Sequence, residues 1–137
     1  MYRLLPYIKK VGVLHEPFYE YLQREKSITS TISPKIYDYI YNMNGVIDYY
    51  KEKGLYDKYQ KELEYAYVRY AYATFIKSCL GYQKEEFLKA VDEAIKCVHE
   101  KFPKYRKNTY FYKSLKGLYL VLFSKTLAKL LYRVRSK

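Results

Sequence analysis

The sequence has no tryptophan, two cysteines, four prolines and five glycines in 137 residues. Cys79 and Cys97 are not arranged as a C-x-x-C pair, which excludes both a disulfide framework and a zinc signature of the usual spacing. We therefore expect buried free thiols in a reducing cytosol rather than metal ligands. The glycines are isolated from one another, so the chain contains no glycine-rich loop that could hold a phosphate.

Long apolar runs are also missing, and so are acidic residues in the last quarter of the chain. No run approaches the roughly 20 apolar residues of a transmembrane helix. Residues 101–137 contain 11 Lys and Arg and no Asp or Glu, whereas residues 1–100 contain 15 and 14. The net charge of +12 is therefore concentrated in this basic tail. Such asymmetry favours an anionic partner, which is a lipid surface or a nucleic acid.

Most of the chain has the apolar periodicity of α-helices. Residues 33–54 place Ile36, Ile40, Met43, Ile47 and Tyr50 on one stripe, between an N-capping Ser33-Pro34 pair and Gly54. Further helices are predicted over residues 57–80 and 84–101, and a last amphipathic helix follows Asn108-Thr109. The predicted apolar faces of these three helices contain, in order, Leu63, Tyr67, Tyr70, Ala73, Ile76 and Leu80; Phe87, Val91, Ile95 and Val98; and Leu115, Leu118, Tyr119, Leu122, Phe123, Thr126, Leu127, Leu130, Leu131 and Val134.

The first 32 residues have a different pattern. Residues 2–10 are typical of the end of a helix that has no capping residue before it, which leads us to expect a chain cut from a longer protein. Residues 11–14 and 18–23 favour strands and together predict a two-stranded β-ribbon. Two strands alone are marginally stable, so we expect partner strands in a larger sheet. The predicted fold is mainly α: a three- to four-helix bundle with a short N-terminal β-ribbon and a basic amphipathic C-terminal helix.

No set of residues in this chain predicts catalysis. The neighbouring acids, such as Glu62 with Glu64 and Glu85 with Glu86, are typical of solvated helix faces rather than of acid–base pairs. Ser27, Thr29, Ser30 and Thr31 have no nearby histidine that could activate a hydroxyl. We expect the isolated chain to be inactive as an enzyme.

The stretch HEPFYEYLQREKSITS, residues 15–30, resembles the segment that closes the catalytic domain of bacterial family 2 glycosyltransferases. In that family an acid-Pro-Leu-Tyr-x-Tyr run leads to an Arg and then to a Ser-Ile pair. The matching residues here are Glu16, Pro17, Phe18, Tyr19, Tyr21, Arg24, Ser27 and Ile28, with Phe18 in place of the commoner leucine. The preceding residues 2–14 also resemble the helix and strand that follow the family's Glu-Asp catalytic motif. The resemblance is clear over about the first 30 residues and looser beyond them.

The resemblance implies an A-type nucleotide-sugar fold with a DxD motif, Mg²⁺ or Mn²⁺ and an acidic general base, all upstream of Met1. It also implies that residues 1–32 form the end of the catalytic domain. Residues 33–137 would then form a C-terminal helical domain with the basic tail 101–137. Arg24 is then expected to pair with the diphosphate of the donor, because a guanidinium is a planar two-pronged donor. Ser27 and Thr29 are expected to donate to phosphate or sugar oxygens. Alternatively, Arg24 forms an ion pair with Glu20 or Glu25 at the surface.

The basic tail has four interpretations. As part of such a transferase it would hold the enzyme at the inner, cytoplasmic face of the membrane, where a lipid-linked polysaccharide acceptor is elongated, with Lys116, Lys125, Lys129, Arg133 and Arg135 at the lipid surface. Alternatively, the apolar stripe packs against the other helices. A nucleic-acid-binding protein, using Tyr105, Tyr110, Tyr112 and Tyr119 for base stacking, is a less favoured alternative. A membrane-surface or partner-docking adaptor without an enzymatic parent is the fourth. The ribbon and the stripe could also drive self-association.

Overall fold

The computed structural model describes residues 2–17, 19 and 34–135. The chain divides into two units, Met1–Thr31 and Ile32–Lys137. In the first unit the described residues form one 3₁₀ turn, η1 (Leu5–Tyr7), and are otherwise without regular secondary structure. The helix end predicted over residues 2–10 is therefore reduced to a single turn. Pro6 restricts the residue before it, and so short a segment does not meet the cost of helix nucleation by itself.

The predicted β-ribbon is not supported. Residues 11–14 form no strand, and the side chains of Val11, Val13 and Leu14 are 80%, 73% and 75% exposed. Most of the second predicted strand, residues 18 and 20–23, lies outside the described residues. A strand pair needs a covering layer or further strands to be stable in water, and residues 11–14 have no buried side chain that such a layer would cover.

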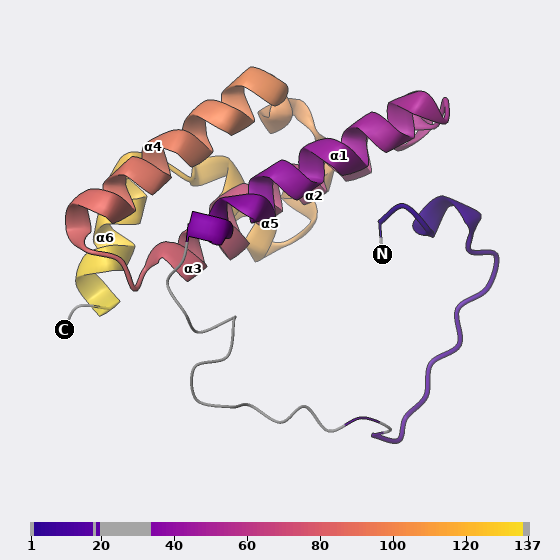
Figure 1. Cartoon of the computed structure of the whole chain (residues 1–137), viewed down its shortest axis with the longest axis horizontal. Coiled ribbons are helices and arrows are strands. Elements are labelled where there is room, and N and C mark those ends of the chain that lie inside the picture. The colour runs from indigo at the N-terminus through magenta and orange to yellow at the C-terminus, as the bar shows by residue number, and fades with distance from the viewer. Residues whose placement is uncertain (1, 18, 20–33, 136–137) are drawn as a thin grey trace. The chain divides into compact units, whose positions relative to one another are not determined.

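The second unit is helical, in agreement with the predicted class (Figure 1). Its elements are η2 (Pro34–Tyr37), α1 (Asp38–Glu52), α2 (Tyr56–Arg69), the π-helix η3 (Tyr70–Phe75), α3 (Ile76–Cys79), α4 (Lys84–Lys101), η4 (Tyr105–Lys107), η5 (Thr109–Lys113), α5 (Leu115–Leu122) and α6 (Lys125–Arg135). The continuous rod formed by α2, η3 and α3 contacts both α1 and α4, and α6 packs along α4. This central rod therefore carries the core of the unit.

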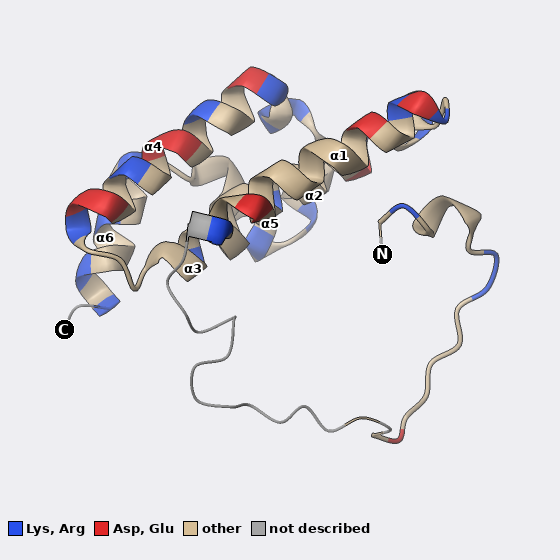
Figure 2. Cartoon of the chain, in the orientation of Figure 1, with Lys and Arg blue, Asp and Glu red and all other residues tan. Residues whose placement is uncertain are grey.

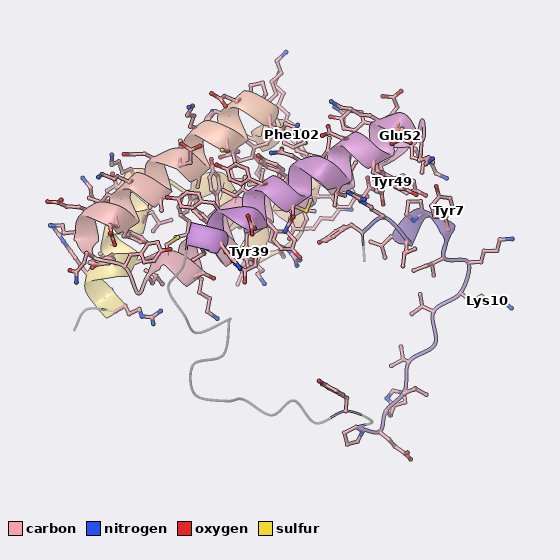
Figure 3. All side chains as sticks on the ribbon, viewed as in Figure 1. Tyr7, Lys10, Tyr39, Tyr49, Glu52 and Phe102 are labelled. Atoms are coloured by element: carbon pink, nitrogen blue, oxygen red, sulfur yellow. The ribbon has the colours of Figure 1, made fainter. Side chains whose placement is uncertain are left out.

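Helices α1 and α4 match their predicted stripes. In α1 the residues Ile40, Met43, Ile47 and Tyr50 are buried, and Gly54 follows with φ of +64°, the left-handed conformation that favours glycine after a helix. Helix α4 has the predicted bounds, and Phe87, Val91 and Val98 are buried while Ile95 is half-buried. Figure 3 shows side chains filling the space between these ribbons, with Phe102 just beyond the end of α4.

The predicted helix over residues 57–80 contains a π-helix, which shifts its apolar face. Tyr70 and Ala73, predicted to face the core, are half-buried, whereas Ala71, Tyr72 and Phe75 are buried. A π turn contains one more residue than an α turn, so the residues after it rotate to a new register. The stripe therefore continues from Tyr67 through Tyr72 rather than through Tyr70.

The predicted last helix is not continuous. After two 3₁₀ segments the chain forms α5, breaks at Phe123 and Ser124, and continues as α6. Phe123 has extended dihedral angles (φ −56°, ψ 131°) and is buried at 3% exposure. Ser124 accepts a hydrogen bond from the backbone N–H of Leu127 at 3.3 Å, which is the contact of an N-terminal cap. A buried ring and a capping serine thus divide one apolar pattern into two helices.

Candidate functional site

Helix α5 presents three leucines to solvent. Leu115, Leu118 and Leu122 are 87%, 38% and 69% exposed, and their spacing places them on one side of the helix. We refer to these three residues as the leucine face. The opposite side is buried through Gly117 and Leu120. The apolar stripe predicted for this segment therefore does not simply pack into the core, because part of it faces outward.

Gly117 determines this orientation of α5. A Cβ atom at this position would collide with the carbonyl oxygen of Phe111 and lie 2.7 Å from its carbonyl carbon. Ser114 caps the helix, because its hydroxyl accepts a hydrogen bond from the Gly117 N–H at 3.1 Å. The close approach of Gly117 to η5 fixes which side of α5 is buried. The leucine face is turned outward as a result.

Two side-chain hydrogen bonds hold the side of α5 nearer the core, one from Tyr119 and one from Arg106. The Tyr119 hydroxyl donates to the backbone oxygen of Tyr72 at 3.2 Å, and burial raises the pKa of Tyr119 above its usual value of 10. Arg106 lies near the end of the helix, where its Nε donates to the backbone oxygen of Val121 at 3.2 Å. Cations are favourable at this end because the last carbonyls carry partial negative charge. These contacts hold α5 in place beneath its exposed leucines.

The basic residues predicted to lie at a lipid surface occupy three different environments. Lys116 is exposed in the first turn of α5, and Arg135 is exposed in the last turn of α6. The ammonium group of Lys125 lies 2.6 Å from a carboxylate oxygen of Asp92 on α4, so its charge is partly neutralised within the protein. Lys129 and Arg133 line a pocket between α4 and α6. In Figure 2 the ribbon of α6 carries only basic and uncharged residues, whereas α4 carries both signs.

That pocket has a volume of about 210 Å³. Its walls are Lys84, Phe87 and Leu88 from α4 and Lys129, Tyr132 and Arg133 from α6. Phe87 was predicted to lie in the core, whereas Lys84, Leu88 and Tyr132 were not predicted to belong to a site. The spacing of four residues between Lys84 and Leu88 indicates that they share one side of a helix. Nothing in the sequence indicated that α6 would lie beside them.

The tyrosines considered for base stacking are mostly engaged within the protein. Tyr105 is 1% exposed, and Tyr119 is half-buried. The Tyr110 hydroxyl donates to a carboxylate oxygen of Glu62 at 2.7 Å, and the ammonium group of Lys113 lies 4.5 Å from the centre of its ring. Tyr112 is 55% exposed. The four rings therefore do not form one open stacking surface.

In the described part of the chain, the other side chains that could react or bind a metal occur singly rather than in clusters. Cys79 is buried and its thiol has a pKa raised to about 12 by burial; Cys97 is half-buried, with a pKa raised to about 11 by burial and by the neighbouring Glu93. Between residues 2 and 135, the described residues contain no group of three or more His, Cys, Asp or Glu that could hold a metal ion. No helix among them is long and apolar enough to cross a membrane. Arg24, Ser27 and Thr29, the predicted substrate-binding residues, lie outside the described residues.

The chain matches no protein-family model, and neither curated proteins nor solved structures include a significant match.

Proposed function

We propose that this chain is the C-terminal helical region of a family 2 glycosyltransferase and that it attaches that enzyme to an anionic membrane surface. The resemblance of residues 15–30 to the family supports the parentage. The observation that carries the membrane role is the leucine face, three outward leucines on a helix within a tail that has no acidic residue. In this proposal the protein acts at the cytoplasmic face of the membrane.

Attachment in this proposal needs both the leucine face and the basic residues near it. Full burial of one leucine contributes about 1.5–3 kcal/mol, and a helix lying at the lipid interface buries its apolar side only in part. Each Lys or Arg near an anionic surface contributes about 1 kcal/mol, and this attraction falls off within a Debye length of about 8 Å in physiological salt. Lys116 is in α5 itself, and Lys113 lies at the end of η5, just before the capping residue Ser114. Leucines and charges together therefore predict binding that requires anionic lipid.

The chemistry of sugar transfer belongs to the catalytic domain of the proposed parent. That domain would bind the nucleotide sugar with Mg²⁺ or Mn²⁺ and supply the general base. Arg24, Ser27 and Thr29 would contribute donors to the diphosphate or the sugar at its last edge. The helical region supplies position: it keeps the catalytic domain close to an acceptor that is itself held in the membrane.

Vesicle flotation of the 137-residue chain tests the surface role. The chain is mixed with phosphatidylcholine vesicles with and without phosphatidylserine. We expect flotation only with the anionic vesicles, and we expect the triple variant Leu115→Ser, Leu118→Ser, Leu122→Ser to lose it. The matched control is Val11→Ser, Val13→Ser, Leu14→Ser, which removes three exposed apolar side chains of the first unit. Equal flotation of the two triple variants would contradict the assignment to α5, and equal flotation with neutral vesicles would contradict the role of charge.

The same preparation separates the alternative partners. Salt-sensitive binding to single-stranded or duplex DNA, without binding to vesicles, would favour a nucleic-acid-binding protein. The parentage has its own test in the genomic DNA upstream of the Met1 codon. We expect an open reading frame that continues into a DxD motif with an acidic residue just before Tyr2. A stop codon followed by a ribosome-binding site would overturn the parentage and leave the surface role to stand alone.

A further inference from the structure

The pocket between α4 and α6 is built from aromatic packing. The rings of Phe87 and Tyr132 have centroids 4.8 Å apart and planes inclined at 31°. The Tyr132 hydroxyl donates to the backbone oxygen of Tyr82 at 2.9 Å, which fixes the direction of its ring. Phe87 is fully buried and Leu88 is half-buried. The interior of the pocket is therefore an ordered apolar surface.

Three cationic side chains surround this apolar interior. Lys84 comes from the first turn of α4, and Lys129 and Arg133 come from successive turns of α6. The residues that line the pocket include no carboxylate. Nearer the start of α6, Asp92 of α4 is engaged by Lys125 at 2.6 Å. The pocket thus combines apolar walls with three positive charges that are provided by two helices.

The size of the pocket limits what can enter it. About 210 Å³ equals the volume of about seven water molecules at roughly 30 Å³ each in the liquid. Sites for drug-sized ligands are larger, about 300–1,000 Å³. A phosphate with a few methylene groups fits this volume, whereas a whole nucleotide sugar does not.

We propose that this pocket binds one anionic membrane lipid, with the phosphate held by Lys84, Lys129 and Arg133 and the first methylenes of the lipid against Phe87, Leu88 and Tyr132. Charge-assisted hydrogen bonds from ammonium and guanidinium groups to phosphate oxygens are about twice as strong as neutral ones. A free phosphate ion would leave the apolar walls of Phe87, Leu88 and Tyr132 uncovered, and a neutral lipid would place no negative charge beside Lys84 and Lys129. An alkyl phosphate satisfies both.

This inference goes beyond attachment through α5 and rests on other residues. The leucine face gives general adhesion to an anionic interface. The pocket would instead bind a single lipid molecule whose phosphate can reach the basic side chains. Lys129 and Arg133, predicted from the sequence to lie at the lipid surface, receive a specific role in the pocket.

Titration of the 137-residue chain with octyl phosphate, below its critical micelle concentration, tests the pocket directly. Backbone amide NMR signals are followed, with inorganic phosphate and the neutral octyl glucoside as parallel ligands. We expect saturable binding of one octyl phosphate, with shifts concentrated at residues 84–88 and 129–133. Equally tight binding of inorganic phosphate would reduce the site to an anion site, and equally tight binding of octyl glucoside would reduce it to an apolar hollow. Both results would overturn the proposal.

Variants distinguish the pocket from general charge. Lys84→Gln with Lys129→Gln should weaken octyl phosphate binding by about tenfold or more, because two charge-assisted hydrogen bonds to the phosphate are lost. The matched control is Lys89→Gln with Lys96→Gln, two exposed lysines of α4 outside the pocket. Equal weakening by both pairs would contradict a specific site.

A third variant keeps the charge and fills the pocket. Leu88→Trp should abolish octyl phosphate binding, and thermal melting establishes that the variant is folded. The same variant should still float with phosphatidylserine vesicles, because the leucine face is intact. Unchanged octyl phosphate binding by folded Leu88→Trp would overturn the pocket. Loss of flotation by the α5 triple variant with octyl phosphate binding preserved would support the two sites as separate.

Discussion

The rings of Tyr72 and Phe123 are stacked, with centroids 4.3 Å apart and planes inclined at 21°. Tyr72 lies in the π-helix η3, and Phe123 lies at the break between α5 and α6. Two departures from regular α-helix, 51 residues apart in the sequence, therefore meet at one contact. The extra residue of the π turn brings Tyr72 into the core, and the break allows Phe123 to cover it.

Replacing Phe123 by alanine is expected to lower the free energy of unfolding by about 3–5 kcal/mol, because a buried ring is lost and a cavity is left. Urea unfolding followed by circular dichroism measures the change. Leu115→Ala is the matched control, since Leu115 is 87% exposed on the adjoining helix and should change stability by less than about 0.5 kcal/mol. Equal effects of the two variants would contradict the stacked contact as a core element.

Gly117→Ala tests what turns the leucine face outward. The added Cβ would collide with the Phe111 backbone, which cannot move as freely as a side-chain tip. Overpacking of this kind costs about 1–3 kcal/mol. The control is Gly12→Ala, where a Cβ would have no atom within 4 Å. If both variants melt at the wild-type temperature, the close approach of α5 to η5 does not orient this helix.

Helices α1 and α4 were predictable because their apolar residues recur at uninterrupted spacings of three and four. Ile40, Met43 and Ile47 belong to one stripe under any arrangement of the other helices. The π turn was not predictable in this way, because Tyr70 and Tyr72 have the same intrinsic preference. Packing against Phe123 and Tyr105 selects Tyr72 for the core, and these contacts come from distant parts of the chain.

The sequence predicted that the three leucines of the leucine face lie on one side of a helix, but not that this side faces outward. Periodicity shows that Leu115, Leu118 and Leu122 share a side, but a stripe has the same spacing whether a neighbouring helix covers it or water does. The deciding residue is Gly117, whose role depends on contact with Phe111. The capping serines before α5 and α6 were readable signals of the break. The pairing of Lys125 with Asp92, 33 residues earlier, had no local sign.

The hydroxyls of Tyr105 and Tyr132 provide a test of hydrogen-bond satisfaction. Tyr105 is 1% exposed, and among the described residues its hydroxyl forms no hydrogen bond of good geometry, although it lies near the Tyr72 hydroxyl, whose pKa is raised by burial and by Tyr105. Tyr105→Phe should therefore leave the stability unchanged or raise it, because an unsatisfied buried group is removed. Tyr132→Phe loses the bond to the Tyr82 backbone oxygen and should cost about 0.5–1.5 kcal/mol. Thermal and urea unfolding of both variants measure the contrast. Destabilisation by Tyr105→Phe equal to that of Tyr132→Phe would contradict it.

Asn108 and Glu64 predict a specific dependence of stability on pH. Asn108 is 4% exposed, and its Nδ2 donates to a carboxylate oxygen of Glu64 and to the Lys61 backbone oxygen, both at 2.8 Å. Burial raises the pKa of Glu64 above its usual 4.5, and the hydrogen bond from Asn108 opposes that rise. Asn108→Ala removes the opposing donor, so the pKa of Glu64 should rise further.

A carboxyl group whose pKa is higher in the folded than in the unfolded state lowers stability as it ionises. Its effect is absent below the unfolded pKa, grows as the pH rises through the folded pKa and is constant above it. The difference in unfolding free energy between wild type and Asn108→Ala should therefore widen as the pH rises from below 4.5, the usual pKa of this carboxyl, to neutral pH. In the Glu64→Gln background the same substitution should cost a constant amount across this range. A difference that is independent of pH with Glu64 present would mean that Asn108 acts only through the Lys61 carbonyl and its own capping bond to Tyr110.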